Sequence, residues 1–462
     1  MVSEKKNHVG FSTRIGFVLA AGRAAGGLGA NIPAGSAVGL GNIWRFPYLA
    51  AQYGGGIFLL VYIILAVTFG FSLMITEIAI GRKTGKSVIG AYASISRKFA
   101  PLGWIAAAVP IIIFPYYCVI GGWVLKYLTV YLTGTGAGAA DDGTFFNSFI
   151  GGTSQPLLFL AIFIILTSAV VLMGVQKGIE KVSTVLMPLL VIISIVIAVY
   201  TLTLDGAVDG LLYYLKPNFK EFSLKTLVAA MGQLFYSMSL AMGIMITYGS
   251  YMRKEDNLEK SVRHIELFDT AVAFISGMMI IPAVFAFSGG NKDALSAGPK
   301  LMFITLPNVF ASMSGGKIIG AVFFILVLLA ALTSSISLME TIVSILCEKL
   351  KAKRKTICIF VMISAFAIGI LSVFGYSIWS GFTIAGKQLL DFFDFFSNNI
   401  LMPIVALFTC ILIGYVAKTK IIEDEIELNS KFKSVKMYRI MMKYIAPVFM
   451  LAIFISSVIG YV

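Results

Sequence analysis

The chain has 462 residues, of which 58% are hydrophobic and only 13% are charged, and its mean hydropathy is +0.92. Soluble domains average roughly 45–50% apolar and about 25% charged residues, so this composition argues against a disordered chain, a secreted disulfide scaffold and a nucleic-acid-binding protein. The 36 Lys and Arg against 22 Asp and Glu give a net charge of +14, and in membrane proteins such an excess collects in cytoplasmic loops. The composition predicts a polytopic inner-membrane protein.

Apolar segments long enough to cross a bilayer, which takes about 20 residues, recur along the whole chain. In order, eleven spans are predicted at 14–48, 56–80, 102–132, 156–174, 182–204, 224–251, 265–287, 318–347, 356–376, 389–416 and 438–461. Two further apolar stretches, 210–215 and 301–310, are too short to span and suit interfacial or re-entrant helices.

The charges of the loops predict the orientation. Five basic residues and no acid stand between the second and third spans, and five more between the eighth and ninth: Arg82, Lys83, Lys86, Arg97, Lys98, Lys349, Lys351, Lys353, Arg354 and Lys355. The loop after the third span offers Asp141 and Asp142 instead. Because basic loops stay on the cytoplasmic side, the N-terminus is predicted in the cytoplasm, and an odd number of spans places the C-terminus outside.

Two spans contain residues that weaken a helix in mid-membrane. Glycines and a serine interrupt the first span at 34–42, and serines and a glycine interrupt the sixth at 237–243. Matched interruptions are typical of transporters built from inverted repeats, although small residues also simply allow close helix packing. The repeat interpretation divides the chain into 1–204 with spans 1–5, 205–416 with spans 6–10, and 417–462 with a cytoplasmic loop and span 11.

Polar groups inside the other spans add to this pattern. Asp269, Glu77 and Glu340 are acids in apolar segments, where an ionisable residue is costly and is a functional candidate by default. Glu77 and Glu340 have a structural alternative, in which each accepts hydrogen bonds from loosened backbone. The hydroxyls of 333–335 either bond to the preceding helical turn or, with freed carbonyls, offer the hard oxygen ligands that alkali cations prefer.

Three strings carry a family resemblance that covers nearly the whole chain. GSAVGLGNIWRFP at 35–47 with YGGG at 53–56, MGQLFYSMSL at 231–240 with TYGSY at 247–251, and LTSS at 332–335 resemble the first, sixth and eighth spans of the neurotransmitter:sodium symporter family. The resemblance implies an all-α polytopic membrane protein with a LeuT-type inverted 5+5 repeat and broken helices 1 and 6. It also implies a sodium-coupled amino-acid symporter, rather than an enzyme, that binds two sodium ions.

The resemblance assigns site residues position by position. The substrate is expected against Ser36, Ala37, Leu40, Gly41, Ile113, Tyr117, Tyr236, Met238, Ser239, Met242, Ser335 and Leu338. The first sodium ion is expected at Ala37, Asn42, Ser237 and Asp269, and the second at Gly35, Val38, Ala330, Thr333 and Ser334. Arg45 and Asp394 correspond to an outer gate above Tyr236, unless Arg45 is a plain interfacial anchor.

Specificity is predicted from three features. Gly39 stands where relatives that carry monoamines have an Asp, so the substrate is expected to bring its own carboxylate. Asp269 replaces an Asn, and Ala273 replaces a Ser, of chloride-binding relatives, which favours chloride-independent transport. The flexible thioether of Met242 fits varied apolar shapes, which favours uptake of hydrophobic or aromatic L-amino acids by alternating access.

The first span departs from the family pattern. Residues 22–33, with Arg23 and Pro33, have no counterpart in it, and His8 and Phe11 stand where relatives usually have Arg and Trp at an inner gate. The insert either displaces the start of the span into the cytoplasm, bulges out, or impairs the protein. The alternative function is therefore a transporter-like amino-acid sensor that binds without cycling, and the oligomeric state is left open.

Overall fold

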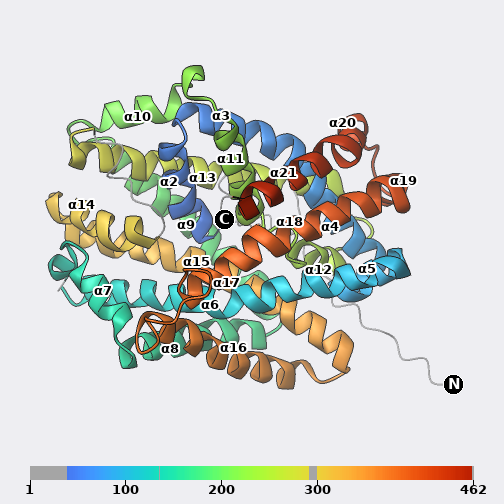
Figure 1. Ribbon diagram of the computed structural model, residues 1–462, viewed down its shortest axis with the longest axis horizontal. Helices are drawn as coiled ribbons and strands as arrows, with labels where there is room; N and C mark the ends of the chain where they lie inside the picture. Colours follow the sequence, from blue (N-terminus) through green and yellow to red (C-terminus); the bar gives the residue numbers. More distant parts are fainter. Residues whose placement is uncertain (1–38, 135, 291–298, 460–462) are drawn as a thin grey trace.

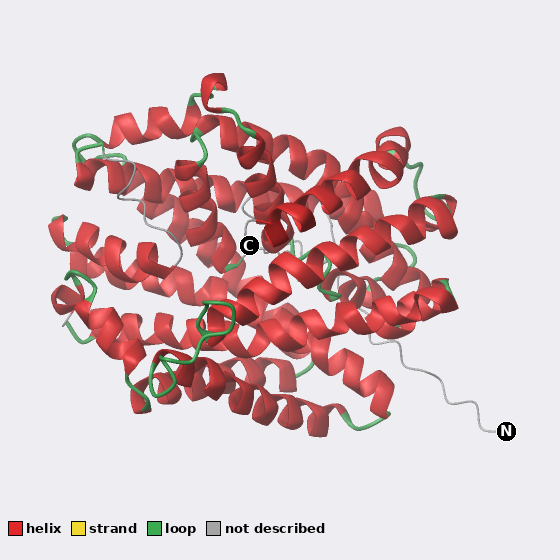
Figure 2. Cartoon of the chain, viewed as in Figure 1, coloured by secondary structure: helices red, strands yellow, loops and turns green. Residues whose placement is uncertain are grey.

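The protein is a bundle of helices. The computed structural model describes residues 39–134, 136–290 and 299–459, and every named element in these ranges is helical (Figures 1 and 2). Among the described residues, nine helices are long and apolar enough to cross a membrane, which confirms nine of the predicted spans: Gly56–Thr84, Arg97–Leu132, Ser154–Leu172, Lys181–Thr201, Leu258–Ser288, Gly316–Leu350, Arg354–Tyr376, Leu389–Val416 and Val435–Ser457. The two predicted spans missing from this set are the first and the sixth, the ones with interruptions.

The first part of the chain contains the described end of span 1 and spans 2–5. Its elements are η2 (Gly41–Arg45), α2 (Phe46–Gln52), α3 (Gly56–Leu65), η3 (Ala66–Gly70), α4 (Phe71–Thr84), α5 (Val88–Ile95), η4 (Arg97–Phe99), α6 (Ala100–Leu132), η5 (Gly136–Ala139), α7 (Thr144–Gly151), α8 (Ser154–Leu172), η6 (Val175–Glu180) and α9 (Lys181–Thr201).

The second part contains spans 6–11. Its elements are α10 (Ala207–Leu215), η7 (Phe219–Glu221), α11 (Leu224–Ser237), α12 (Ile244–Tyr251), α13 (Leu258–Ser288), η9 (Leu301–Thr305), α14 (Leu306–Ser312), α15 (Gly316–Leu350), α16 (Arg354–Tyr376), α17 (Leu389–Phe395), η10 (Phe396–Leu401), α18 (Met402–Ile411), η11 (Leu412–Val416), α19 (Lys420–Ile426), α20 (Val435–Ile440), η12 (Met441–Ile445) and α21 (Ala446–Ile459).

The sixth span is broken where its sequence predicts. α11 ends at Ser237 and α12 begins at Ile244, and between them Ser239, Ala241 and Gly243 have positive φ values of 53°, 61° and 72°. Left-handed backbone is unfavourable for residues with a Cβ, so the surrounding structure has to hold it in place. Glu77 contributes here, because its buried Oε1 accepts the Ala241 N–H at 2.8 Å. The corresponding residues of span 1, 34–38, lie outside the described residues.

Two glycines bring α4 and α12 into backbone contact. A Cβ on Gly81 would lie 2.0 Å from the carbonyl oxygen of Ile246, and a Cβ on Gly249 would lie 2.3 Å from that of Ile78. Neither position has room for a side chain, so the small residues here do serve close helix packing. The second half of the broken span is thereby fixed against span 2.

The helix contacts of the two parts correspond to each other. α4 packs on α12, which joins spans 2 and 6, and α13 packs on η2 and α2, which joins spans 7 and 1. Likewise α6 packs on α8 and α15 on α16, while α6 and α15 run side by side through the middle of the molecule (Figure 1).

Large apolar side chains are exposed on the outer helices. In α9, Val185, Ile192, Val196 and Val199 are each more than half exposed, and in α16 Phe360 and Ile363 are as well. A water-soluble protein rarely exposes contiguous apolar surface on this scale, whereas a bilayer covers it. The fold is thus an all-α polytopic membrane protein, and the short apolar stretch predicted at 301–310 forms η9 and α14 beside the spans.

Candidate functional site

A small cavity lies where η2, the break in span 6, α6 and α15 meet. It is small, with about 30 Å³ of free space. Its walls are formed by Gly39, Leu40, Gly41, Asn42, Ile113, Tyr117, Tyr236, Ser237, Ser239, Met242, Ile244, Ser334 and Leu338. A larger molecule can occupy it only if some of these side chains move.

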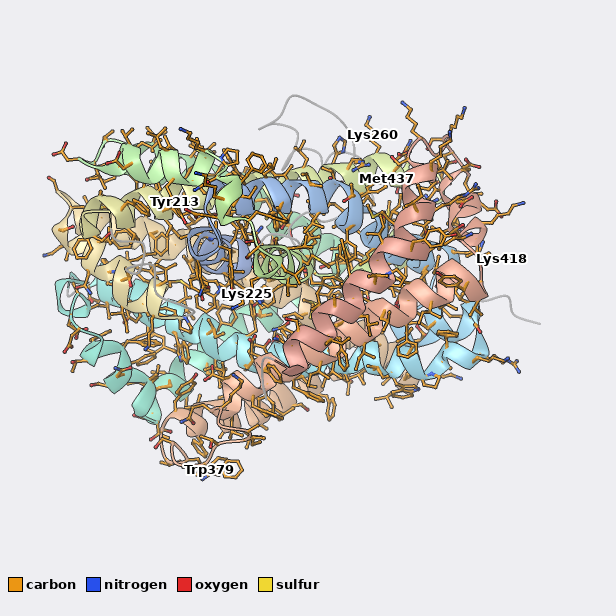
Figure 3. All side chains as sticks on the ribbon, turned by 45° about the horizontal axis from the view of Figure 1, so that its top comes forward. Tyr213, Lys225, Lys260, Trp379, Lys418 and Met437 are labelled. Carbon is orange, nitrogen blue, oxygen red and sulfur yellow. The ribbon has the colours of Figure 1, made fainter. Side chains whose placement is uncertain are left out.

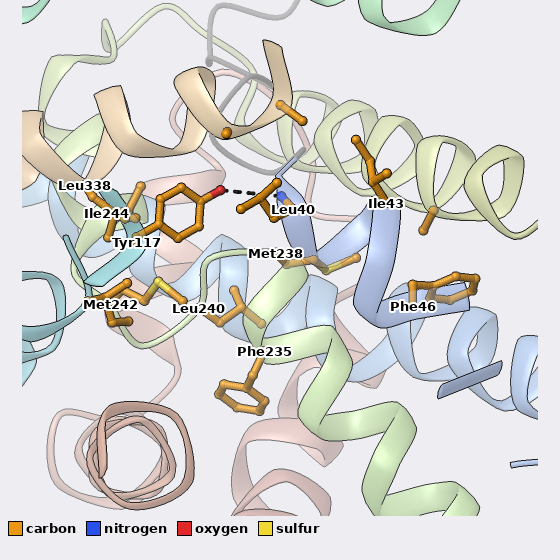
Figure 4. Close-up of a cluster of buried hydrophobic side chains, with 14 of the residues drawn as sticks. Leu40, Ile43, Phe46, Tyr117, Phe235, Met238, Leu240, Met242, Ile244 and Leu338 are labelled. Atoms are coloured by element: carbon orange, nitrogen blue, oxygen red, sulfur yellow. Dashed lines mark hydrogen bonds between the residues drawn. The ribbon is translucent and has the colours of Figure 1, made fainter. Parts of the chain in front are cut away.

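One end of the cavity is polar. The Leu40 N–H donates to the Tyr117 hydroxyl at 3.4 Å (Figure 4), and the side chain of Ser334 also bonds to Tyr117. A Cβ on Gly39 would lie 2.3 Å from Ser334 Oγ and 3.4 Å from the Tyr117 hydroxyl, so a side chain at this position would fill the polar end. Backbone N–H groups and a hydroxyl at the start of a helical segment are suited to bind an anionic group.

The other end of the cavity is apolar. Ile113, Met242, Ile244 and Leu338 are buried side chains that line it, and Figure 4 shows the last three around the ring of Tyr117. The Tyr236 ring lies against Gly41, where a Cβ would be 2.5 Å from Tyr236 Cδ1. The cavity therefore joins an anion-binding end to an apolar end.

A buried carboxylate lies beside this cavity. Asp269 of α13 is fully buried, and its Oδ1 accepts from Asn42 Nδ2 at 2.8 Å and from Ser237 Oγ at 2.8 Å. Asn42 Nδ2 also donates to the Asp269 carbonyl at 3.2 Å, while Asn42 Oδ1 accepts the Gly39 N–H at 3.0 Å. All of these donors are neutral, so an ionised Asp269 is stabilised further by a cation in this place.

Two residues of this region were missed by sequence reasoning. The Tyr62 hydroxyl donates to Asp269 Oδ2 at 3.2 Å, and Gln233 Nε2 donates to the Gly41 carbonyl at 2.9 Å. Tyr62 resembles any core aromatic in an apolar span, and no motif marks it. Gln233 lies within the string at 231–240, and an amide side chain inside an apolar span is a signal that could have identified it. The structure shows this side chain fully buried.

The predicted outer gate is built around Tyr236. The Arg45 guanidinium lies 5.1 Å above the centre of the Tyr236 ring. Asp394 Oδ1 accepts from Tyr116 at 3.1 Å and from Asn398 at 2.7 Å, and the charge of Arg45 acts on this carboxylate. Arg45, which is partly buried, thus makes a cation–π contact with Tyr236.

The second predicted sodium site is described in part. Thr333 Oγ1 donates to the carbonyls of Leu329 at 3.2 Å and Ala330 at 3.0 Å, as a hydroxyl in a helix commonly does. Ser334, its neighbour, lines the cavity. The remaining predicted ligands and two of the predicted substrate contacts, Gly35, Ser36, Ala37 and Val38, lie outside the described residues, as does the 22–33 insert.

Two predicted substrate contacts point elsewhere. Ser335 is hydrogen-bonded to Thr167 of α8 at 2.8 Å, and Met238 places its sulfur 2.8 Å from where a Cβ on Gly70 would stand. Neither lines the cavity, whereas the other described residues of the predicted substrate set do. Gly39 and Ile244 line it without having been predicted as contacts.

The other acids of the spans have partners that explain them. Glu340 of α15 is bound by Tyr251 at 2.7 Å and by both terminal nitrogens of Arg354. Glu348 Oε2 accepts the Ser87 N–H at 2.5 Å, just before α5. Within the described ranges no group of three or more His, Cys, Asp or Glu side chains is placed to bind a metal ion.

The fold and the site together define a polytopic membrane protein with a broken helix and a buried acid beside a small cavity. The chain belongs to the sodium:neurotransmitter symporter family, whose profile matches residues 31–140 and 147–462. It is a member of a family of sodium-dependent transporters and not an enzyme.

Individual relatives agree with this membership. The uncharacterized sodium-dependent transporter YhdH of Bacillus subtilis is 34% identical over 99% of both chains. An uncharacterized sodium-dependent transporter of Haemophilus influenzae is 34% identical over 92% of this chain and 95% of its own. The crystal structure of MhsT in complex with L-phenylalanine superposes with a TM-score of 0.85 at 36% identity and covers 97% of this chain and 99% of MhsT.

Proposed function

We propose that this protein is a sodium-coupled symporter that takes up hydrophobic or aromatic L-amino acids by alternating access, independently of chloride. The observation that carries the proposal is the Asp269 carboxylate, which is fully buried beside the cavity and whose side-chain partners among the described residues are the neutral donors Asn42, Ser237 and Tyr62. A fixed negative charge in this place attracts a sodium ion without the help of a bound anion. The proton that such an acid can also bind offers a route for exchange on the return step.

The substrate class is supported by the two ends of the cavity. The polar end, with the Leu40 N–H and Tyr117, suits a carboxylate, and the absence of a side chain at Gly39 leaves this position open. The apolar end suits a large apolar side chain, and MhsT, a relative at 36% identity, was crystallised with L-phenylalanine. We place the sodium ions, two in number, at the two predicted ligand sets, the first containing Asn42, Ser237 and Asp269.

The arrangement in the membrane is part of the proposal. Inverted repeats at 1–204 and 205–416 account for the corresponding contacts of spans 2 with 6 and 7 with 1. We propose that the N-terminus faces the cytoplasm, that 417–462 forms a cytoplasmic loop and span 11, and that the C-terminus lies outside a bacterial inner membrane.

The test is uptake by the purified full-length protein in liposomes under an imposed inward sodium gradient. Phenylalanine, tryptophan and leucine are expected to accumulate above lysine, aspartate and glycine, and replacing sodium by choline is expected to abolish uptake. Replacing chloride by gluconate is expected to leave the rate unchanged. Sodium-independent uptake would overturn the symport proposal, and strong chloride dependence would overturn its chloride part.

A matched pair of variants probes the carboxylate end. Tyr117→Phe removes the hydroxyl at the cavity, whereas Tyr127→Phe removes a buried hydroxyl of the same helix that donates to the Phe303 carbonyl at 2.7 Å. Tyr117→Phe is expected to raise the half-saturating substrate concentration about tenfold, since a hydrogen bond to a charged group contributes about 1.5–3 kcal/mol. Tyr127→Phe is expected to leave it unchanged.

The insert at 22–33 favours one alternative, an amino-acid sensor that binds without cycling, because Arg23 and Pro33 are unusual within a span. Sodium-dependent binding without counterflow would support the sensor. Deletion of 22–33 separates the two functions, because uptake that appears only after the deletion identifies the insert as the block.

A further inference from the structure

A second, basic pocket lies far from the central cavity, between the end of span 10 and the start of span 11. It has a volume of about 410 Å³ and is lined by Gly414, Tyr415, Lys418, Thr419, Lys420, Glu423, Arg439, Lys443 and Tyr444. Four of these side chains are basic and one is acidic. Figure 3 shows Lys418 at the edge of the molecule, where the C-terminal helices end.

The helices that form this pocket fix its shape. Gly414 lets η11 approach η12 so closely that a Cβ there would lie 3.0 Å from the Met442 carbonyl. The Tyr415 hydroxyl donates to the Lys443 carbonyl across the same contact. Lys418 ends the span with a positive φ of 65°, which turns the chain back over the pocket into α19.

The charge of the pocket is only partly balanced. Glu423 and Arg439 form an ion pair with N···O distances of 2.8 and 2.6 Å, and the Arg439 guanidinium holds the pKa of Glu423 below its usual range. The charge of Lys443 also acts on Glu423, while no ion pair within 4 Å is found for Lys418, Lys420 or Lys443 among the residues that the structure describes. Three ammonium groups around one pocket attract a multivalent or phosphate-bearing anion.

An apolar surface continues from the pocket along both helices. Tyr444, Val448, Leu451 and Ile455 of span 11 follow helical spacing on one face and are 64%, 64%, 48% and 44% exposed. On span 10, Tyr415 and Phe408 are two turns apart and 55% and 43% exposed. Tyrosines at the end of a span mark the membrane–water interface, so the basic pocket lies at headgroup level and the apolar faces at acyl-chain level.

We propose that this pocket binds the headgroup of an anionic phospholipid, with the phosphate between Lys418, Lys420 and Lys443 and the acyl chains along the exposed faces of spans 10 and 11. A free phosphate ion matches the three lysines equally well, but it leaves the adjoining apolar faces uncovered. Basic pockets between spans on the cytoplasmic side are typical lipid sites. On the proposed topology this loop is cytoplasmic, but the lipid site itself does not depend on the transport activity.

The test is native mass spectrometry of the full-length protein after incubation with phosphatidylglycerol or phosphatidylethanolamine in detergent. The wild-type protein is expected to retain phosphatidylglycerol at least fivefold more than phosphatidylethanolamine. The triple variant Lys418→Gln, Lys420→Gln, Lys443→Gln is expected to lose this preference. A control with the same change of charge, Lys98→Gln, Lys353→Gln, Lys355→Gln, alters exposed lysines of other loops and is expected to keep it.

Competition and folding controls complete the design. Millimolar glycerophosphate or inorganic phosphate is expected not to displace the lipid, because neither contacts the apolar faces. Displacement by the free phosphates would overturn the lipid assignment, and so would equal retention of phosphatidylglycerol by the pocket variant and the wild type. If the pocket variant melts at a lower temperature, the single variant Lys420→Gln, at an exposed position, replaces it and is expected to reduce retention about twofold.

Discussion

Asp269 and Glu340 are both completely buried acids in long apolar helices, yet their surroundings differ in one respect. Glu340 is bound by the guanidinium of Arg354, which belongs to the next span, and by Tyr251. Asp269 is bound by an amide and two hydroxyls, all neutral. Glu340 thus has a countercharge, whereas among the residues that the structure describes Asp269 contacts no cationic side chain.

The difference separates a structural acid from a site for a cation. In a buried ion pair each charge compensates the other, so Glu340 and Arg354 tie α15 to α16 without the need for a bound ion. A buried carboxylate that accepts hydrogen bonds only from neutral donors has no countercharge, and a bound cation supplies one. The contacts of Glu340 therefore fit the structural role that the sequence left open for it. Its partner, however, is the guanidinium of Arg354 and not the loosened backbone that was expected. Glu77 does accept a backbone N–H, that of Ala241.

The largest expected effect comes from neutralising Asp269. Asp269→Asn keeps the shape of the side chain and its oxygen acceptor but removes the charge. We expect sodium-driven uptake in chloride-free medium to fall at least about 100-fold, equivalent to about 2.7 kcal/mol, and chloride to restore part of it. The measurement is initial uptake rate in liposomes with chloride or gluconate outside. Unchanged chloride-free uptake would show that Asp269 is not a sodium ligand.

Removing the charge of Glu340 tests the other half of the comparison. Glu340→Gln leaves Arg354, whose side chain is 33% exposed, without its counterion, and we expect a loss of stability of about 2–3 kcal/mol. The double variant Glu340→Gln, Arg354→Gln is expected to regain much of it, because no unpaired charge remains. Thermal unfolding of the purified protein measures both. A change in sodium or chloride requirement would contradict the structural role.

The elements of the fold could largely be predicted from the sequence, because apolar length and interruptions by glycine and serine are local properties. Span 10 is predicted at 389–416 and observed as Leu389–Val416, and the break predicted at 237–243 begins after Ser237. The amphipathic helix α5 was not predicted, since its eight residues are too few for a span.

Side-chain direction was harder to predict than position along the chain. In a helix, the side chains of neighbouring residues point about 100° apart. Ser334 therefore lines the cavity, whereas the next residue, Ser335, forms a hydrogen bond with Thr167 of α8. Within the break at 238–243 the backbone follows no period at all, so Met238 and Ser239 point to different sides. Tyr62 could not be assigned to Asp269 because their contact joins residues 207 positions apart.

A smaller effect is expected from the donor that the sequence did not reveal. Tyr62→Phe removes the hydroxyl that orients Asp269 but keeps the ring, which packs 4.9 Å from that of Phe46. Loss of a residue that orients an ion ligand typically lowers ion affinity 10–100-fold, so we expect the half-saturating sodium concentration to rise about tenfold. Tyr92→Phe, which removes a buried hydroxyl bonded to Thr409 at 2.6 Å, is the control and is expected to leave sodium dependence unchanged.

The smallest effect is expected where an acid–arginine pair lies at the surface. Glu423 and Arg439 repeat the chemistry of Glu340 and Arg354, but the Arg439 side chain is 54% exposed, so water screens the pair. Arg439 lowers the pKa of Glu423 in the folded protein, so the ionised Glu423 stabilises the folded state. This contribution to the free energy of unfolding is fully present above the ordinary carboxyl range and is lost as the pH falls through the lowered pKa. Glu423→Gln is expected to lower the melting temperature slightly at pH 7, and this deficit is expected to shrink as the pH is lowered through the carboxyl range. If Glu423→Gln lowered the melting temperature at pH 7 as much as Glu340→Gln does, burial would not decide the strength of these two ion pairs. The distinction between the acids would then rest on Asp269 alone.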